Sequence, residues 1–275
     1  MNICSLQDAS FDFGVNRELS LFVMFRSSGF VFAVFEPQTS KYYCLFEEKM
    51  DESVDFCDFF LNHCNENRWL SLEFKQSFFV YETPNFIIHP EKLLSYTNEQ
   101  AFSMQQFFCN AGNTSQTNKL LNENITIQFD IDVVFQSLLD HKFGNCRYCH
   151  ISELFLKYHL KYQNKLTSVQ FQLYRGVGFL LVMILKNGRI ELFNTYPCNS
   201  DADLIYYVSL LYKTFETKDV EVSGAFDING DAMQNLKKVF NIKKTFFSMD
   251  YNYMFSISDI DQSQYSTIIN QTLCE

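Results

Sequence analysis

One fifteen-residue pattern occurs twice in this chain, and the repeat limits the possible folds more than any other feature. Residues 21–35 read LFVMFRSSGFVFAVF, and residues 170–184 read QFQLYRGVGFLLVMI. Aligned without a gap, most positions are apolar in both, and the two stretches are identical at Phe22/Phe171, Arg26/Arg175, Gly29/Gly178 and Phe30/Phe179. Each stretch has the pattern of two strands joined by a short turn that carries glycine, which predicts a β-hairpin.

The segments that follow the two hairpins also correspond. A third strand is predicted after each hairpin, and an acidic segment then starts a helix, for which Asp201 is the expected N-cap in the second copy. Strand, helix, strand and helix follow in both copies. The predicted ranges after the hairpin are 42–46, 51–64, 125–131, 133–143, 146–150 and 152–162 in the first copy, and 190–193, 201–215, 220–226, 231–240, 244–249 and 263–273 in the second.

The repeat predicts two domains, 1–163 and 164–275, each a β-β-β-α-β-α-β-α unit of an α/β fold. The first copy has extra material near 69–124 that the second lacks. Within it we expect a pair of strands at 69–74 and 78–81. The polar run NAGNTSQTN at 110–118 is expected to be a flexible loop.

Three antiparallel strands followed by alternating helices and parallel strands resemble the ribonuclease H-like unit. Two such units in one chain resemble the actin-like ATPase superfamily. More closely, the chain resembles a bacterial family of unknown function with this fold, on the motifs FRSSGF, FIIHPEKLL at 86–94, and ITIQFDID followed by a helix and CRYCH. The resemblance implies the duplicated actin-like fold, and a fold alone does not imply an activity.

The resemblance also implies where ATP would bind. Actin-like ATPases hold the phosphates between two glycine-rich hairpins, with an aspartate after each first strand. Here Arg26 and Arg175 stand near those positions, and Gly224 is the single glycine where the family has a pair. We therefore expect no ATP turnover, although an anion or a nucleotide could bind between the lobes. The candidate contacts are Arg26, Ser27, Ser28, Gly29, Arg175, Gly176, Gly178 and Gly224. Alternatively, each arginine is a remnant of the duplication that caps its hairpin or pairs with a nearby acid.

Three further patterns suggest metal or acid–base sites, and each has a simpler explanation. CRYCH matches the haem-attachment pattern and offers Cys146, Cys149 and His150 to zinc, but buried thiols on a core strand explain it equally. Asp130 and Asp132 could bind a metal, or Asp132 could cap the following helix. The run from Asp227 to Asp231 resembles half a calcium loop, and we expect a strand-to-helix turn with Asp231 as N-cap. No cofactor is predicted.

Composition bears on partners and location. The net charge is −10 and no basic run occurs, so nucleic acid is not an expected partner. The N-terminal segment lacks the features of a signal peptide, and no apolar run is long enough to span a membrane. We expect a cytoplasmic location, nine free cysteines, and no membrane partner.

The expected function is a non-catalytic actin-like scaffold or binding module, with a cleft between its lobes and an unknown protein as partner. The alternative is a divergent nucleotide-dependent ATPase or phosphotransferase. A third class, weaker than these, is a metal or redox protein that uses Cys146, Cys149 and His150.

Overall fold

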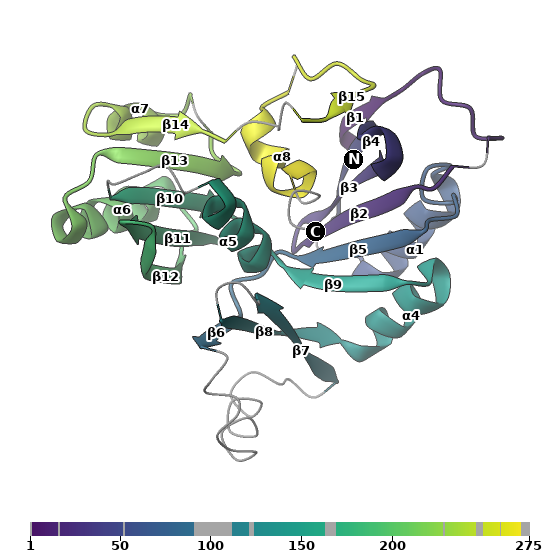
Figure 1. Cartoon of the computed structure of the whole chain (residues 1–275), viewed down its shortest axis with the longest axis horizontal. Helices are drawn as coiled ribbons and strands as arrows, with labels where there is room; N and C mark the ends of the chain where they lie inside the picture. The colour runs from purple at the N-terminus through teal and green to yellow at the C-terminus, as the bar shows by residue number, and fades with distance from the viewer. Residues whose placement is uncertain are drawn as a thin grey trace. The chain divides into compact units, whose positions relative to one another are not determined.

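The computed structural model describes residues 2–15, 17–51, 53–90, 112–120, 124–162, 169–227, 229–245, 250–258 and 260–270. The chain forms two compact units (Figure 1). Unit 1 comprises Met1–Glu153 and Met249–Ser258, and unit 2 comprises Leu154–Ser248 and Asp259–Glu275. The domain boundary that the sequence predicts, between residues 163 and 164, lies outside the described residues and stays a prediction.

Unit 1 is built on one mixed sheet. The first predicted hairpin forms its centre, and a strand from each of two later segments joins it in parallel. The strand order is β1-β4-β3-β2-β5-β9, and the two-residue β15 pairs with the start of β4. The bounds are β1 Asn2–Gln7, β2 Ser20–Arg26, β3 Gly29–Glu36, β4 Lys41–Lys49, β5 Gln76–Tyr81, β9 Cys146–His150 and β15 Asn252–Tyr253.

Unit 2 repeats this arrangement with the second hairpin at its centre. Its five-stranded sheet has the order β12-β11-β10-β13-β14, which matches β4-β3-β2-β5-β9 strand for strand. In both sheets, three antiparallel strands are extended by two parallel ones, which confirms the predicted α/β unit. The bounds are β10 Gln170–Arg175, β11 Phe179–Lys186, β12 Arg189–Pro197, β13 Asp219–Gly224 and β14 Asn241–Lys244.

Most helices begin within one residue of the predicted start, but the helix predicted at 51–64 begins only at Phe56, after the N-cap Asp55, and two other N-caps also differ. Asp132 caps its helix as expected, and its Oδ1 accepts a hydrogen bond from the Phe135 amide at 2.8 Å. Ser200 rather than Asp201 caps α6, because Ser200 and Asp203 form a reciprocal capping box. Gly230 rather than Asp231 precedes α7. The bounds are α1 Phe56–Glu66, α4 Val133–Phe143, α5 Ile151–Tyr162, α6 Asp201–Phe215, α7 Asp231–Lys237 and α8 Gln262–Ile269.

The prediction for residues 69–74 was wrong. No strand forms there, because Trp69 turns into the core, where its Nε1 donates to Gln7 Oε1 at 2.9 Å and its ring packs on Phe11 and Phe13. The segment predicted to pair with it is β5, which instead runs parallel to β2 in the main sheet. In unit 1, β5 is therefore the strand that pairs in parallel with the hairpin, as β13 does in unit 2. The sequence repeat predicts residues 125–131 for this position, and that prediction is wrong.

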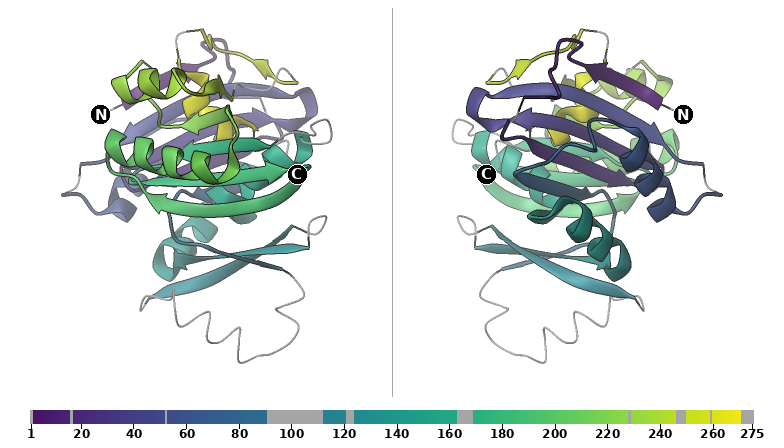
Figure 2. Two further views of the ribbon diagram at one scale, coloured as in Figure 1. Left: turned by 90° about the vertical axis from the view of Figure 1, so that its left-hand side faces the viewer. Right: turned by 90° about the vertical axis from the view of Figure 1, so that its right-hand side faces the viewer.

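Residues 125–131 belong to a separate three-stranded sheet in unit 1, with the order β6-β8-β7. Figure 2 shows it as the blue-green strands at the bottom of both views. Its bounds are β6 Ile87–Pro90, β7 Asn113–Leu120 and β8 Ile125–Asp132. The expected loop at 110–118 is thus largely strand β7, whose polar side chains find partners: Asn118 donates to the Tyr148 carbonyl oxygen at 2.8 Å.

Aromatic packing in the core of unit 1 holds the end of β2 in place. The Phe25 ring lies 5.1 Å from Phe60, 5.0 Å from Phe135 and 5.7 Å from Phe79, and three different elements supply these neighbours. Burying each such ring stabilises the fold by roughly 1.5–3 kcal/mol. The next residue along the chain is Arg26, so this packing positions the first candidate contact.

Candidate functional site

Arg26 is the last residue of β2, and its side chain is buried. Ser27 and Ser28 form the turn, and Gly29 starts β3 opposite Arg26. The Arg26 Nε donates to Glu82 Oε2 and its Nη1 to Glu47 Oε1, both at 2.8 Å. The exposed fractions of these side chains are 6% for Arg26, 7% for Glu47 and 2% for Glu82. The three groups therefore form an ion-pair cluster inside unit 1.

The cluster changes what the first hairpin can bind. Two carboxylates surround one guanidinium, so the charge that would attract a phosphate is already compensated by the chain itself. Sequence analysis did not identify Glu47 or Glu82. Glu82 could have been found from its position directly after a strand, since polar groups at the carboxyl ends of neighbouring parallel strands meet at one sheet edge.

Gly29 is needed for the close packing of β3 against β4. Its φ is +137°, a backbone conformation that side chains disfavour, and a Cβ added there would overlap the Glu48 carbonyl oxygen of the neighbouring strand. The missing side chain therefore lets β3 approach β4.

The candidate residues of unit 2 also come together. Arg175 ends β10 opposite Gly224, the last residue of β13, and the turn after β10 holds Gly176 and Gly178. Arg175 Nη1 donates to Asp201 Oδ1 at 2.9 Å, with exposed fractions of 16% and 52% for the two side chains. This ion pair is more exposed than the Arg26 cluster, so solvent screens it more.

The candidate glycines of unit 2 likewise pack closely against other atoms of the protein. A Cβ on Gly176 would overlap the Phe179 ring, and one on Gly224, whose φ is +89°, would overlap the Arg175 carbonyl oxygen. At Gly178 it would come within 3.3 Å of Asn199 Oδ1. Both arginines thus pair with acids, one of the two alternatives from the sequence. Anion or nucleotide contact by these residues stays a prediction.

The CRYCH segment forms strand β9, and its polar atoms are engaged. The Cys146 thiol lies 3.0 Å from the Gly144 carbonyl oxygen and 3.5 Å from that of Leu139, and burial raises its pKa to about 12. His150 Nδ1 accepts from the Ser152 amide at 3.2 Å, so Nε2 carries the proton and donates to the Thr83 carbonyl oxygen at 3.0 Å. In the described parts of the chain, no three His, Cys, Asp or Glu side chains are grouped to hold a metal.

We expect purified protein to contain no stoichiometric zinc or haem. Burial raises the pKa of the Cys146 thiol, which makes the thiolate that binds metals costly to form, and both His150 nitrogens already have partners. Elemental analysis and an absorption spectrum check this. One zinc per chain, or a Soret band that disappears in Cys146→Ser, would contradict it.

The other suggested carboxylate sites have structural roles. Asp132 caps α4, as described above. Asp227 Oδ1 accepts from the Asn229 amide at 3.1 Å, which closes a turn before α7 in place of a calcium loop. Asp130, two residues before Asp132 on β8, lines a pocket.

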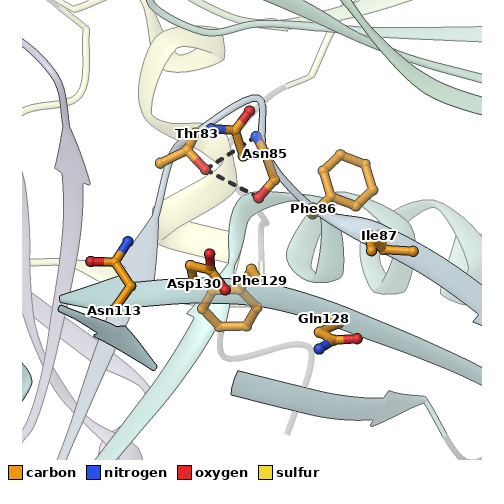
Figure 3. Close-up of a pocket in the computed structure, with 8 residues that line it drawn as sticks. All are labelled: Thr83, Asn85, Phe86, Ile87, Asn113, Gln128, Phe129 and Asp130. Atoms are coloured by element: carbon orange, nitrogen blue, oxygen red, sulfur yellow. Dashed lines mark hydrogen bonds between the residues drawn. The ribbon is translucent and has the colours of Figure 1, made fainter. Parts of the chain in front are cut away.

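This pocket lies within unit 1, beside the small sheet, and has a volume of about 140 Å³. Its polar lining consists of Thr83, Asn85, Asn113, Gln128 and Asp130. Figure 3 shows Thr83 and Asn85 on the loop that follows β5, across from Asp130 on β8, with Gln128 further along the same strand. Among these polar residues the sequence pattern indicates Asp130 alone, because the lining comes from three stretches that lie apart in the chain, 83–87, 113 and 128–130.

The rings of Phe86 and Phe129 and the side chain of Ile87 complete the wall. The His150 ring lies behind them, 4.9 Å from Phe86 and 5.4 Å from Phe129. Its burial lowers its pKa to about 3, so it brings no positive charge to this region near neutral pH.

Comparisons with solved structures show the fold. A Bacteroides thetaiotaomicron protein with actin-like ATPase fold and unknown function superposes with a TM-score of 0.75 and 20% sequence identity, covering 86% of this chain and 94% of that one. The PilM–PilN type IV pilus biogenesis complex gives a TM-score of 0.60 at 8% identity, with 92% of this chain and 97% of that one covered. The actin-like fold expected from the sequence is therefore confirmed.

A search among curated proteins found no sequence similar to this chain. None of the helices in the described parts of the chain combines the length and the apolar character that crossing a membrane requires. The family described as "Protein of unknown function (DUF3822)" matches residues 8–242. Because this match spans most of the sequence, the chain belongs to the DUF3822 family of proteins of unknown function.

Proposed function

We propose that this protein is a non-catalytic member of the actin-like fold that acts as a binding module for a partner protein. The observation that carries the proposal is the buried cluster at the end of β2. Where an ATPase of this fold would hold phosphate and metal, Arg26 is bonded to Glu47 and Glu82 at 2.8 Å each. A phosphate there would have to displace a buried carboxylate, which leaves an uncompensated charge in the interior.

The glycines support the same proposal. Phosphate-binding loops need glycine so that backbone amides can approach the ligand. At Gly29, Gly176 and Gly224, atoms of the chain itself fill the space that the missing side chain leaves. Phosphoryl transfer depends on charge neutralisation and positioning, and the arginines at the two hairpins, Arg26 and Arg175, already pair with acids of the chain.

A role in a protein complex has a parallel in a structure of similar fold. The PilM–PilN complex of type IV pilus biogenesis contains such a protein together with another protein. We also infer that the two units arose by internal duplication, since their sheets share one strand order. A further inference, from the sequence, is that the protein acts in the bacterial cytoplasm.

The test is a phosphate-release assay with Mg²⁺-ATP at high protein concentration. We expect the parent chain to release phosphate no faster than the buffer blank. The matched variant is Arg175→Ala, which removes a candidate phosphate contact but only a partly exposed ion pair, so the fold should persist.

Steady phosphate release by the parent that is lost in Arg175→Ala would contradict the proposal. That result would favour the alternative, a divergent nucleotide-dependent ATPase or phosphotransferase. Release that is equal in both proteins and falls with further purification indicates a contaminating enzyme.

A further inference from the structure

The outer edge of strand β7 presents a row of backbone donors and acceptors. β7 lies at the end of the strand order β6-β8-β7, so β8 pairs with one of its edges (Figure 1). The Val133 amide donates to the Gly112 carbonyl oxygen at 3.1 Å, which makes these two residues a hydrogen-bonded pair in line with the β7–β8 ladder. Hydrogen-bonded and non-hydrogen-bonded positions alternate in an antiparallel pair. The backbones of Asn113, Ser115 and Thr117 therefore face away from β8.

These outward groups can be reached from solvent. Within the described ranges of the chain, no hydrogen bond is made by the backbone N–H or C=O of Asn113, Ser115 or Thr117. Thr117 is exposed, and the other two residues are partly exposed. Each of the three offers one donor and one acceptor on the same side, at the two-residue spacing of a strand. A second extended chain matches such a row group for group.

Side chains hold β7 in the position that such pairing requires. Gln116 Nε2 donates to Gln136 Oε1 on α4 at 3.3 Å. Asn118 Nδ2 donates to the Tyr148 carbonyl oxygen on β9 at 2.8 Å. The edge is therefore ordered before anything pairs with it, which reduces the entropy lost on binding.

β7 lacks the features by which proteins protect a sheet edge. Protected edge strands are short, or they carry proline or lysine. β6, the other edge of the small sheet, has four residues and ends in Pro90. β14, an edge of the sheet in unit 2, has four residues, and the last two are lysines. By contrast, the run Asn113–Asn118 on β7 contains neither charge nor proline, and Lys119 comes only after it.

The edge of β7 is complementary to itself. About a two-fold axis at Ser115, Asn113 of one chain lies opposite Thr117 of a second copy, and Ser115 lies opposite Ser115. Every outward N–H then meets an outward C=O, because both strands present the same alternate residues. The side chains that face each other are polar and uncharged, so the like-charge repulsion that opposes cross-strand pairing does not arise between them.

We propose that β7 pairs antiparallel with β7 of a second copy of this chain, so that the two small sheets join into one. This inference goes beyond the proposed function, which concerns a different protein. The run 113–117 is short for the roughly 1,200–2,000 Å² that a stable interface buries, so the dimer is weak and reversible. The net charge of −10 on each chain opposes it at low salt.

Sedimentation equilibrium of the full chain in about 0.15 M salt tests the proposal, because this salt concentration screens much of the charge repulsion. We expect the average mass to rise from that of one chain towards that of two as the protein concentration increases from about 10 μM to about 1 mM. The mass should not exceed that of a dimer, because a two-fold contact uses the same edge of both copies and closes the assembly.

Two substitutions at Ser115 locate the contact. Ser115→Pro removes an outward N–H and places a ring on the edge, but it leaves the bonds to β8 in place, since this backbone faces away from β8. It should weaken the dimer at least about tenfold, because a two-fold contact contains the change twice. Ser115→Ala keeps the N–H and should associate as the parent does. Both variants lose the hydrogen bond that Gln128 Nε2 donates to Ser115 Oγ at 2.6 Å, so they are matched.

Amide hydrogen exchange, followed by NMR, tests the same contact in the unaltered chain. The amides of Asn113, Ser115 and Thr117 should exchange rapidly in dilute protein and more slowly as the dimer forms. The Thr114 amide faces β8 and serves as the internal reference, so its protection should not change with concentration. This comparison decides the question even where Ser115→Pro fails to fold.

Three results would each overturn the inference. The chain could remain monomeric up to about 1 mM. Ser115→Pro could associate as strongly as Ser115→Ala. The three outward amides could exchange at one rate in dilute and concentrated protein, which would place any association at another surface. Phosphate release is measured separately, so the absence of a dimer while ATP turnover stays at the blank refutes this inference alone.

Discussion

Replacing Arg26 with alanine is expected to lower the free energy of unfolding of unit 1 by about 3–5 kcal/mol, the range measured when one partner of a buried ion pair is removed. The guanidinium is bonded to Glu47 and Glu82 at 2.8 Å each, and all three side chains are less than one tenth exposed. In Arg26→Ala, the Glu47 and Glu82 carboxylates stay close together in the interior and lose the positive charge that Arg26 places between them. Urea denaturation at neutral pH measures the change.

Arg175→Ala is the matched control, since it removes the equivalent arginine of unit 2. Its partner Asp201 is 52% exposed, so we expect a loss of about 0–1 kcal/mol. A second comparison adds Glu47→Gln and Glu82→Gln to the Arg26→Ala chain, which removes the excess negative charge and should recover part of the stability. Equal losses in Arg26→Ala and Arg175→Ala would show that the burial of the cluster has no energetic consequence.

Acidification from pH 7 to pH 5 is expected to cost about 2 kcal/mol for each of two buried histidines. His150 in unit 1 and His159 in unit 2 both have a pKa that burial lowers to about 3. In the unfolded chain a histidine has a pKa of about 6.5, so below that value the unfolded state binds protons that the folded state does not. Stability is therefore complete above pH 6.5 and decreases as the pH falls towards 3.

A histidine variant separates this effect from the titration of carboxylates. The His159 ring packs on Phe155 and Tyr158, with centroids at 4.5 and 5.0 Å, so leucine can replace much of this contact. In His159→Leu, the free energy of unfolding of unit 2 should depend on pH less steeply between pH 4 and 6, by about 1.4 kcal/mol per pH unit. Urea denaturation at a series of pH values measures both slopes. Identical slopes in parent and variant would mean that His159 takes up its proton in the folded state.

Some features of the site could be anticipated and others could not. The two arginines and the glycines around them were found from the repeat, because a hairpin is a local structure that a short stretch encodes. Their partners could not be found this way, since Glu47 and Glu82 lie 21 and 56 residues from Arg26 along the chain. The pocket around Asp130 could not be predicted from the sequence for the same reason. Its lining residues come from a loop, β6, β7 and β8, and they meet only after the small sheet has formed.

The sequence by itself determined the two hairpins, the helix at 201–215 and the Asp132 cap, because each depends on residues within one or two turns of each other. Only the tertiary structure decided that β5 joins β2 in parallel, that β8 leaves the main sheet, and that polar β7 is a strand. Parallel pairing needs a partner far away in the chain, and a polar strand is stabilised by cross-strand and side-chain hydrogen bonds that exist only once its neighbours are in place.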